Sequence, residues 1–327
     1  MKFLVTGSAG HLGEALVRTL LEQNHQVLGL DLRSSPFTHR VGSIADRPLV
    51  RDCLAGVDAI LHAATLHKPH IATHRRQDFV DVNITGTLTL LEEAYAQKIG
   101  AFVYTSTTSV FGDALIPPAG QPAAWLTEEV TPIPKNIYGV TKAAAEDLCQ
   151  LFSRNQGLSC IVLRTSRFFP EEDDDWAVRD AYADANLKAN EYLYRRVDIE
   201  DVVNAHILAA HCAPSLGFGR YIISATTPFQ RSDLALLRTN APQVVVRRVP
   251  ASERVYARLG WKMVPTIDRV YINEKARRDL GWQPRHDFER LLERLTAGES
   301  ITSRLAHLVG AKGYHAYPSE TGRAKTT

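Results

Sequence analysis

Residues 2–13 read Lys2-Phe3-Leu4-Val5-Thr6-Gly7-Ser8-Ala9-Gly10-His11-Leu12-Gly13, and this stretch decides the fold. It is a short apolar run followed by a loop whose glycines have the spacing Gly-x-x-Gly-x-x-Gly. Apolar residues then recur at helical spacing as far as Leu20, and the run from Gln26 to Asp31 has the composition of a buried strand. This order of strand, glycine loop, helix and strand predicts a β-α-β unit at the start of a parallel sheet.

The glycine loop and Asp31 together predict a dinucleotide site. Glycines let the backbone turn tightly and approach a pyrophosphate, and a helix N-terminus presents N–H groups and a positive dipole end. Asp31 lies 18 positions after Gly13, close to the separation of about 20 expected for a carboxylate that accepts hydrogen bonds from ribose hydroxyls. A 2′-phosphate there would meet that carboxylate, so NAD is favoured over NADP. Arg33 keeps NADP open, because an arginine could receive the phosphate.

Strands and helices continue to alternate along the chain. We predict helices at 47–55, 78–97, from Tyr138, 176–194, 200–211 and 286–297, and strands at 57–62, 101–106, 158–165 and 221–224. This alternation predicts an α/β, Rossmann-type doubly wound parallel sheet with a small C-terminal α/β substrate-binding cap. We place the NAD-binding domain at 1–165 with a return segment at about 197–225, the cap at 166–196 and 226–310, and a flexible tail at 311–327.

Composition excludes several classes of protein. The 327 residues carry a net charge of +2, which gives no electrostatic reason to expect nucleic acid or an anionic membrane as partner. No apolar run approaches the roughly 18 to 20 residues that cross a bilayer, and the N-terminus lacks the features of a signal peptide. The four cysteines have no metal-ligand spacing, and we expect reduced thiols in a cytoplasmic protein.

Tyr138 and Lys142 are the candidate catalytic pair. Four residues apart on a predicted helix, they share one face, one turn from each other. A free phenol has a pKa of about 10, and we expect the ammonium of Lys142 to lower it into the working range of a base. Thr107 belongs to a hydroxyl cluster that follows the strand at 101–106, at the edge of the sheet where ligands bind.

Two charged stretches outside these motifs also need an interpretation. The polar loop after Ala63-Ala64 carries His67, His70 and further basic residues. A metal site is not predicted there, because no carboxylate or cysteine lies at ligand spacing, and a loop that helps bind an anionic or polyhydroxy substrate fits better. The acidic run at 171–175 is predicted to be a solvated surface segment.

The combination of motifs resembles the extended short-chain dehydrogenase/reductase family, also called the NAD-dependent epimerase/dehydratase family, over nearly the whole chain. The matching motifs are Thr6-Gly7-x-x-Gly10-x-x-Gly13, His62-Ala63-Ala64, Asn83-Ile84-Thr85-Gly86-Thr87, Thr107 five residues before Gly112, Tyr138-x-x-x-Lys142, Val197-Asp198-Ile199-x-Asp201-Val202 and Leu280-Gly281-Trp282-x-Pro284.

The resemblance implies a mechanism and a set of site residues. Tyr138 would be the general acid/base, Thr107 would hydrogen-bond the substrate oxygen, and Lys142 would hold the nicotinamide ribose. It also implies a homodimer paired through the helices at 78–97 and after Tyr138. The cofactor site would be lined or supported by Gly7, Gly10, His11, Leu12, Gly13, Asp31, Arg33, Ser43, Ile44, Ala63, Ala64, Asn83, Thr105, Tyr138 and Lys142, and the substrate site by His67, His70, Thr108 and Arg167.

Departures from the family pattern narrow the substrate. Dehydratases carry Thr-Asp-Glu where this chain has Thr107-Thr108-Ser109, so water elimination lacks its usual acid pair. Nucleotide-sugar members carry an asparagine where this chain has Arg167, and they have a longer stretch than the 33 residues between Arg164 and Asp198. We therefore predict an NAD-dependent oxidoreductase or epimerase acting on a sugar-like or other small hydroxy/keto compound. The alternatives are a nucleotide-sugar 4-epimerase and a non-catalytic NAD-binding sensor.

Overall fold

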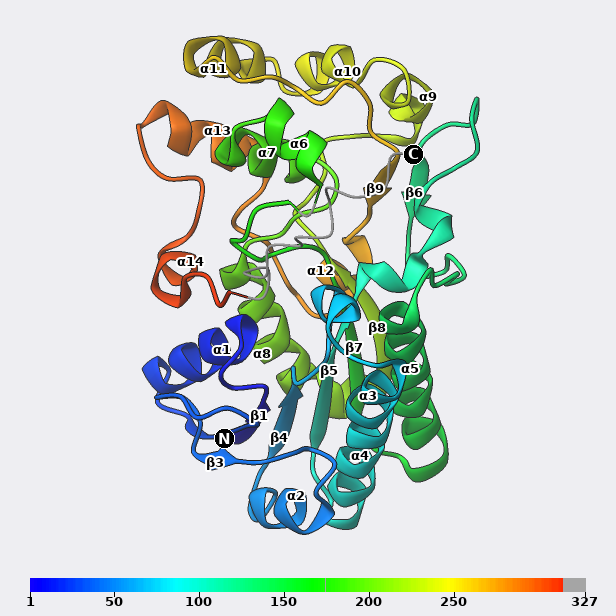
Figure 1. The fold of residues 1–327 in the computed structure, drawn as a ribbon, viewed down its shortest axis with the longest axis vertical. Helices are drawn as coiled ribbons and strands as arrows, with labels where there is room; N and C mark the ends of the chain where they lie inside the picture. Colours follow the sequence, from blue (N-terminus) through cyan, green and yellow to red (C-terminus); the bar gives the residue numbers. More distant parts are fainter. Residues whose placement is uncertain (174, 314–327) are drawn as a thin grey trace.

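A computed structural model describes residues 1–173 and 175–313. Its main sheet has seven parallel strands in the order β3-β2-β1-β4-β5-β7-β8 (Figure 1). The strands are β1 (Lys2–Thr6), β2 (Gln26–Asp31), β3 (Arg40–Val41), β4 (Ala59–His62), β5 (Ala101–Thr107), β7 (Cys160–Thr165) and β8 (Phe218–Ile223), and a separate pair is formed by β6 (Ala124–Leu126) and β9 (Arg269–Tyr271). The predicted doubly wound parallel sheet is confirmed.

Helices occupy both faces of the sheet. The helices are α1 (His11–Glu22), α2 (Arg47–Cys53), α3 (Arg76–Phe79), α4 (Gly86–Ala96), α5 (Ile137–Gln156), α6 (Trp176–Ala181), α7 (Asp184–Glu191), α8 (Ile199–Leu216), α9 (Leu234–Leu237), α10 (Ala241–Arg248), α11 (Ala251–Leu259), α12 (Glu274–Asp279), α13 (Phe288–Thr296) and α14 (Arg304–Val309). Short 3-10 turns cover Lys68–Ala72, Thr108–Phe111, Asp113–Leu115 and Arg231–Asp233, and a π-helix covers Val80–Thr85.

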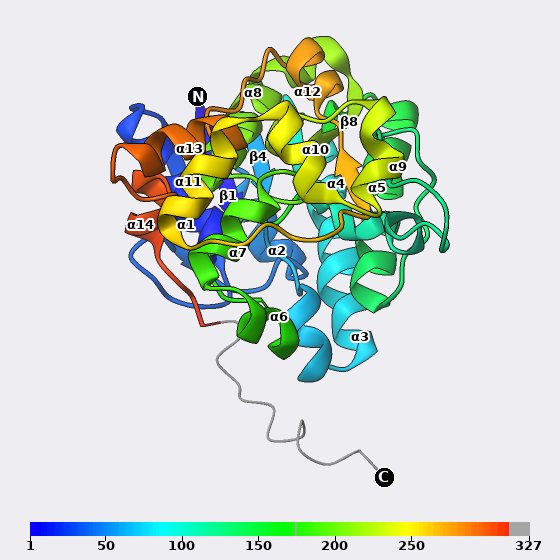
Figure 2. The same ribbon diagram turned by 90° about the horizontal axis from the view of Figure 1, so that it is seen from above.

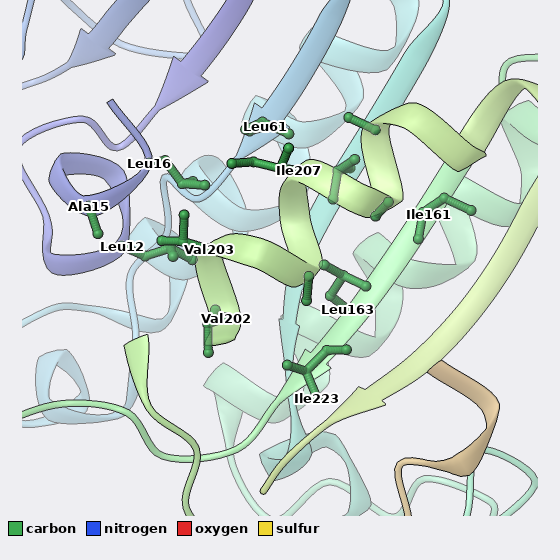
Figure 3. Close-up of a cluster of buried hydrophobic side chains, with 14 of the residues drawn as sticks. Leu12, Ala15, Leu16, Leu61, Ile161, Leu163, Val202, Val203, Ile207 and Ile223 are labelled. Carbon is green, nitrogen blue, oxygen red and sulfur yellow. The ribbon is translucent and has the colours of Figure 1, made fainter. Parts of the chain in front are cut away.

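Side chains that alternate along each strand build two separate cores. On β1, Phe3 and Val5 join the core with α1 and α8, whereas Leu4 joins the core with α2, α4 and α5. Figure 3 shows the first of these, where Leu12 and Leu16 of α1 lie beside Val203 of α8. Because both faces are covered, the strands are apolar nearly throughout.

A third core lies beyond the carboxyl ends of the strands. It is built mainly from residues 189–193 and 225–301, and it includes Leu237, Val245 and Phe288. Figure 2, seen from above, shows α9, α10 and α11 lying in front of the sheet. The carboxyl edge of the sheet therefore faces this cap. The domain boundaries at 165, 197 and 225 stay a prediction.

Several predicted elements need correction. The helix predicted at 176–194 is two helices, α6 and α7, because Tyr182 leaves helical geometry with φ −137° and ψ 138°. The helix at 286–297 is not the last, since α14 follows it. The helix at 78–97 contains the π-helical turn Val80–Thr85. Of the tail predicted to be flexible, residues 314–327 lie outside the described part of the chain.

Candidate active site

The glycine loop forms a tight cradle at the N-terminus of α1. Gly7 has φ +73°, and a Cβ there would lie 2.7 Å from the backbone nitrogen of Ala64. A Cβ on Gly13 would lie 1.9 Å from the carbonyl oxygen of Gly7. Gly10 is the N-cap of α1 and supplies no side-chain cap, so the first-turn N–H groups face the loop. His11 and Leu12, the first residues of α1, are buried.

Asp31 lies at the end of β2, next to this loop. Its carboxylate accepts hydrogen bonds from the backbone N–H groups of Ala9, at 3.0 Å, and of Arg33, at 2.9 Å. The Asp31 carboxylate is thereby fixed beside the loop, while the Arg33 residue is exposed. A carboxylate held there suits ribose hydroxyls and opposes a 2′-phosphate, as expected for NAD.

The end of β4 supplies the opposite wall of the cradle. Nδ1 of the buried His62 lies 2.7 Å from the hydroxyl of Thr6, and its Nε2 lies 2.9 Å from the hydroxyl of Thr87. Burial, with the nearby Lys142 charge, holds the pKa of His62 well below its usual range. His62 is therefore a neutral structural residue that fixes Ala63 and Ala64 against β1.

Two further predicted cofactor residues lie between β3 and α2. The hydroxyl of Ser43 accepts a hydrogen bond from the backbone N–H of Ala45 at 3.1 Å. Ile44 is buried and lies so close to Gly86 that a Cβ on that glycine would be 2.6 Å from Ile44 Cδ1. Ser43 is partly exposed, so its hydroxyl can contact a ligand while Ile44 packs against the helix.

Asn83 anchors the loop after β4 to α5, the helix that carries Tyr138 and Lys142. Its Oδ1 accepts hydrogen bonds from the Thr65 hydroxyl and the Leu66 N–H, at 2.9 and 2.8 Å. Its Nδ2 donates to the Leu66 carbonyl at 2.9 Å and to the Thr141 hydroxyl at 3.0 Å. All four polar contacts are within the protein. Asn83 therefore supports the site indirectly, by fixing the loop at Thr65 and Leu66 against Thr141.

Thr107, Tyr138 and Lys142 meet at the carboxyl end of β5. Thr107 is the last residue of β5, and its hydroxyl bonds to Tyr138. Tyr138 is the second residue of α5, which is capped by Asn136, whose Oδ1 accepts from the Gly139 N–H at 3.0 Å. The three residues are buried.

Lys142 contacts the strand through its ammonium group. Its Nζ donates to the Thr105 carbonyl at 2.6 Å and lies 4.1 Å from the centre of the Tyr104 ring. The hydroxyl of Thr105 lies 2.8 Å from Nε2 of His206 on α8, so Thr105 meets Lys142 through its backbone. Burial lowers the pKa of Lys142 to about 7, against the attraction of Glu146.

The expected lowering of the Tyr138 pKa is wrong for this structure. Burial raises the pKa of Tyr138 to about 12, and the hydrogen bond with Thr107 offsets only part of that increase. Removal of the phenol from water disfavours the phenolate more than a nearby cation favours it. The phenol is therefore protonated near neutral pH, which is the state of a general acid.

Sequence reasoning missed the support beneath this pair. Glu146 lies one turn after Lys142 on α5 and is 1% exposed. Arg164 donates to it from Nε at 3.1 Å and from Nη2 at 2.7 Å, and the Ser106 hydroxyl donates at 2.5 Å. The available signal was a glutamate four residues after the lysine, on the same helix face.

The predicted substrate residues are only partly brought together. Thr108 is buried directly after Thr107. The His67 ring stacks on Phe169 with centroids 5.6 Å apart, and His70 contacts His67 edge-on at 4.5 Å. Arg167 instead turns to the acidic run: it donates to Asp173 at 3.2 Å and to the carbonyls of residues 171 and 172.

The prediction that the acidic run at 171–175 is a solvated surface segment holds for Glu172 and Asp175, which are exposed, but not for Glu171 and Asp173. The Glu171 side chain is 7% exposed, and its Oε1 lies 2.9 Å from Nε2 of His11. Burial opposes ionisation of Glu171, but the hydrogen bond and charge of His11 outweigh it and lower the Glu171 pKa to about 2. Asp173 pairs with Arg167 and Arg195. Residues 167–173, here called the strap, thus connect the end of β7 to the glycine loop.

The two later sequence signatures contact each other. Trp282 donates from Nε1 to the Asp201 carbonyl at 2.9 Å, and the Asp201 carboxylate accepts the N–H groups of Arg285 and His286 at 2.8 and 3.0 Å. Burial raises the pKa of Asp201 to about 6. These signatures therefore join α8 to the segment before α13.

One group among the described residues has the donor types of a metal site. Asp198, Glu200 and His286 have donor atoms within 4.8 Å of one another. The Asp198 carboxylate already accepts the N–H groups of Glu200 and Ser303, at 2.8 and 3.1 Å, and Glu200 pairs with His286 at 3.3 Å. These groups satisfy one another, and the expectation of no metal stays a prediction.

Comparison with known proteins agrees with this geometry. The model of the NAD dependent epimerase/dehydratase family matches residues 3–215. The chain belongs to the NAD-dependent epimerase/dehydratase family. NAD is the cofactor of that family, and the loop, the Asp31 carboxylate and the α1 N-terminus fit it. The resemblance inferred from the motifs is confirmed.

Individual proteins match this chain over different lengths. The protein y4nG of Sinorhizobium fredii is 30% identical over 265 residues, which are 77% of this chain and 61% of that protein. The 2-alkyl-3-oxoalkanoate reductase of Stenotrophomonas maltophilia is 29% identical over 92% of this chain and all of its own length. A crystal structure of a short-chain dehydrogenase/reductase superfamily protein from Agrobacterium tumefaciens with bound NAD has TM-score 0.63 at 24% identity, covering 91% of this chain and 96% of that one. That structure shares the fold.

Proposed function

We propose that this chain catalyses NAD-dependent hydride transfer to and from a small hydroxy/keto compound, with reduction of the ketone favoured near neutral pH. The observation that carries the proposal is the meeting of Thr107, Tyr138 and Lys142 at the carboxyl end of β5, with Tyr138 protonated because its pKa is about 12. A protonated phenol donates a proton to a developing alkoxide. The full-length match to a reductase supports this direction.

Each residue of the trio has one task in the proposed reaction. NAD in its reduced form, when bound, supplies the hydride. Tyr138 donates its phenolic proton to the carbonyl oxygen of the substrate, and in the reverse direction the phenolate takes that proton back. Thr107 donates a hydrogen bond to the same oxygen. Lys142 holds the ribose hydroxyls and, while charged, stabilises the phenolate that remains.

The strap favours a substrate without a diphosphate. Asp173 of the strap follows the end of β7 and pairs with Arg167 and Arg195. The guanidinium of Arg167 is engaged with Asp173 and two carbonyls. The guanidinium of Arg167 could otherwise bind a substrate diphosphate, but it is already paired. A compact ketone or a sugar-like compound needs no such partner.

The same trio would serve a nucleotide-sugar 4-epimerase, in which the hydride returns to the substrate. A panel of ketones, β-keto acids and keto sugars, together with UDP- and dTDP-linked sugars, separates the two functions. A reductase consumes NADH in step with product, measured by absorbance. An epimerase leaves the NADH level constant while NMR shows inversion of one carbon. If no ketone of the panel supports NADH consumption and no sugar is inverted, the proposed function is overturned and a non-catalytic NAD-binding protein is favoured.

We also propose that the protein is a homodimer paired through α4 and α5. Large apolar side chains are exposed on both helices: Tyr95 on α4, and Val140 and Leu151, which are eleven residues apart, on α5. Such exposed side chains suit a helix-helix interface. Light scattering should give a dimer mass that Val140→Asp halves, whereas a monomeric native chain would contradict the pairing.

Localisation in the cytoplasm is a further part of the proposal. Cys53, Cys149, Cys160 and Cys212 are all free thiols, as is usual in a reducing compartment. Across residues 1–173 and 175–313, no helix has the length and apolar character needed to cross a bilayer. A small-molecule substrate and no nucleic-acid partner complete the expected set of interactions.

A further inference from the structure

A buried carboxylate lies directly beneath the proposed acid-base pair. Glu146 is one helical turn beyond Lys142 on α5, and both residues are almost fully buried. Arg164 of β7 holds the Glu146 carboxylate with two N–H groups, and Arg220 of β8 approaches it to 3.2 Å. Burial of a carboxylate has a large desolvation free energy, which favours a specific role for a carboxylate at this position.

The end of β5 is held to α5 by three consecutive residues. The Thr105 carbonyl accepts from Lys142 at 2.6 Å, the Ser106 hydroxyl donates to Glu146 at 2.5 Å, and the Thr107 hydroxyl bonds to Tyr138. The contact through Glu146 is the central one. Ser106, which binds Glu146, lies between Thr105, which binds the ammonium group, and Thr107, which binds the phenol. Displacement of Glu146 would therefore disturb both contacts.

We propose that Glu146 is a positioning residue of the active site, whose carboxylate aligns the end of β5 with α5 and keeps the ammonium group of Lys142 charged. This inference rests on the proposed function, because it gives the Tyr138–Lys142 pair its working geometry and charge. Nothing in the proposal requires Glu146 to touch substrate or cofactor.

The surroundings of Lys142 leave Glu146 as its source of negative charge. Tyr104 presents its ring, and His62 is held neutral by burial. Burial also raises the pKa of Cys149 and of Tyr138, which keeps both neutral near pH 7. The titratable groups that interact with Lys142 are Tyr104 on β5, His62 on β4, and Glu146 and Cys149 on α5, the helix that also carries Tyr138. Burial alone would drive the Lys142 pKa below about 7, and Glu146 opposes that effect.

The test measures the charge of Lys142 without any substrate. Trace acetic anhydride labels only neutral amines, so the pH dependence of Lys142 acetylation, followed by peptide mass spectrometry on the full chain, gives its titration midpoint. In Glu146→Gln, which keeps the side-chain shape, we expect that midpoint to fall by about one pH unit. Glu146→Asp keeps the charge and should restore most of the shift.

A matched control separates this effect from the general loss of a buried ion pair. Glu93 on α4 is 3% exposed and is bound by Arg47 and Arg51 at 3.1 and 3.0 Å, so Glu93→Gln removes an equally buried, arginine-paired charge. The Lys142 midpoint should not move in Glu93→Gln. An unchanged midpoint in Glu146→Gln, or an equal shift in both variants, would overturn the proposal.

A second variant covers the case in which Glu146→Gln does not fold. Removal of both members of the ion pair in Glu146→Gln/Arg164→Met leaves no buried arginine without its carboxylate, a change that proteins often tolerate. The Lys142 midpoint should again fall, because Arg164 is not among the groups that shift Lys142. If the midpoint falls in these variants while no substrate of the panel turns over, the proposed function fails and the role of Glu146 stands.

Discussion

The phenol of Tyr138 and the ammonium group of Lys142 are both shifted toward their neutral forms. Burial is the larger cause in each case, and it moves the Tyr138 pKa up to about 12 and the Lys142 pKa down to about 7. A neutral phenol is the correct state for protonating a ketone. A charged Lys142 is also needed, so we expect reduction to slow as pH rises through about 7, which a rate profile against pH measures.

Loss of the Tyr138 hydroxyl should stop proton transfer without disturbing the fold. We expect Tyr138→Phe to lower the rate of reduction by about 10² to 10⁴, with NADH affinity little changed. Tyr104→Phe is the matched control, because the Tyr104 hydroxyl is buried and has no hydrogen-bond partner among the described residues. Turnover by Tyr138→Phe at the rate of the Tyr104→Phe variant would contradict the assigned role.

Lys142 should reduce stability as well as support activity. Below pH 7 it is charged in both the folded and the unfolded chain, so the full cost of burying the charge is present. Between about 7 and its ordinary value of 10.5 the unfolded chain binds more protons, so the free energy of unfolding rises with pH.

Lys142→Met lacks this dependence and should be more stable at neutral pH by about 1 to 2 kcal/mol, while losing activity. Urea unfolding at several pH values checks this. Lys135→Met is the control, because the Lys135 side chain is 45% exposed, and the idea fails if Lys142→Met is the less stable variant at pH 7.

At the scale of elements, the strap contacts parts of the chain that are far apart in sequence. Phe169 stacks on His67 and contacts His11 edge-on at 5.3 Å, while Glu171 binds His11 and accepts the Lys312 N–H at 3.0 Å. These contacts connect the exit of β7 to the N-terminus of α1, where the pyrophosphate of NAD is expected. The strap should therefore slow the release of the cofactor.

Glu171→Gln should weaken this closure, because the charge attraction to His11 is lost. We expect NADH to dissociate about tenfold faster, consistent with a charged hydrogen bond of about 1.5 kcal/mol, as measured by stopped-flow fluorescence. Glu172→Gln serves as the control, since the Glu172 side chain is 65% exposed. Equal dissociation rates for the two variants would show that the strap does not retain the cofactor.

At the scale of the whole molecule, Asp201 connects the sheet-bearing part of the chain to its C-terminal part. Its two carboxylate oxygens each accept a backbone N–H from residues 285 and 286. Asp201→Asn would direct an amide N–H₂ at one of those donors and should lower the free energy of unfolding by about 1 to 3 kcal/mol. Denaturant unfolding measures this, with the exposed Asp52→Asn as control. Similar stabilities would show that the contact is dispensable.

Local sequence determined the Rossmann half and the placement of the proposed acid-base pair. Gly7, Gly10 and Gly13, with Asp31 at the end of the next strand, predict the dinucleotide cradle, because backbone turns and strand ends follow from near neighbours. The i, i+4 spacing of Tyr138 and Lys142 likewise follows from one helix. In contrast, the boundaries of α6, α7 and α14 depend on tertiary packing, which no local period encodes, and α14 packs against the core that contains α1 and α8.

Tertiary structure alone decided the charges and partners of the site. The sequence predicted a lowered Tyr138 pKa, because it shows the nearby lysine but not the burial that outweighs it. It placed residues 171–175 in solvent, because a run of carboxylates carries no sign of His11, which lies 160 positions away in the chain. Glu146 had no apparent partner until the fold brought Arg164 and Ser106 to it. Desolvation and long-range ion pairs depend on distances in space, and these are fixed only when the chain is folded.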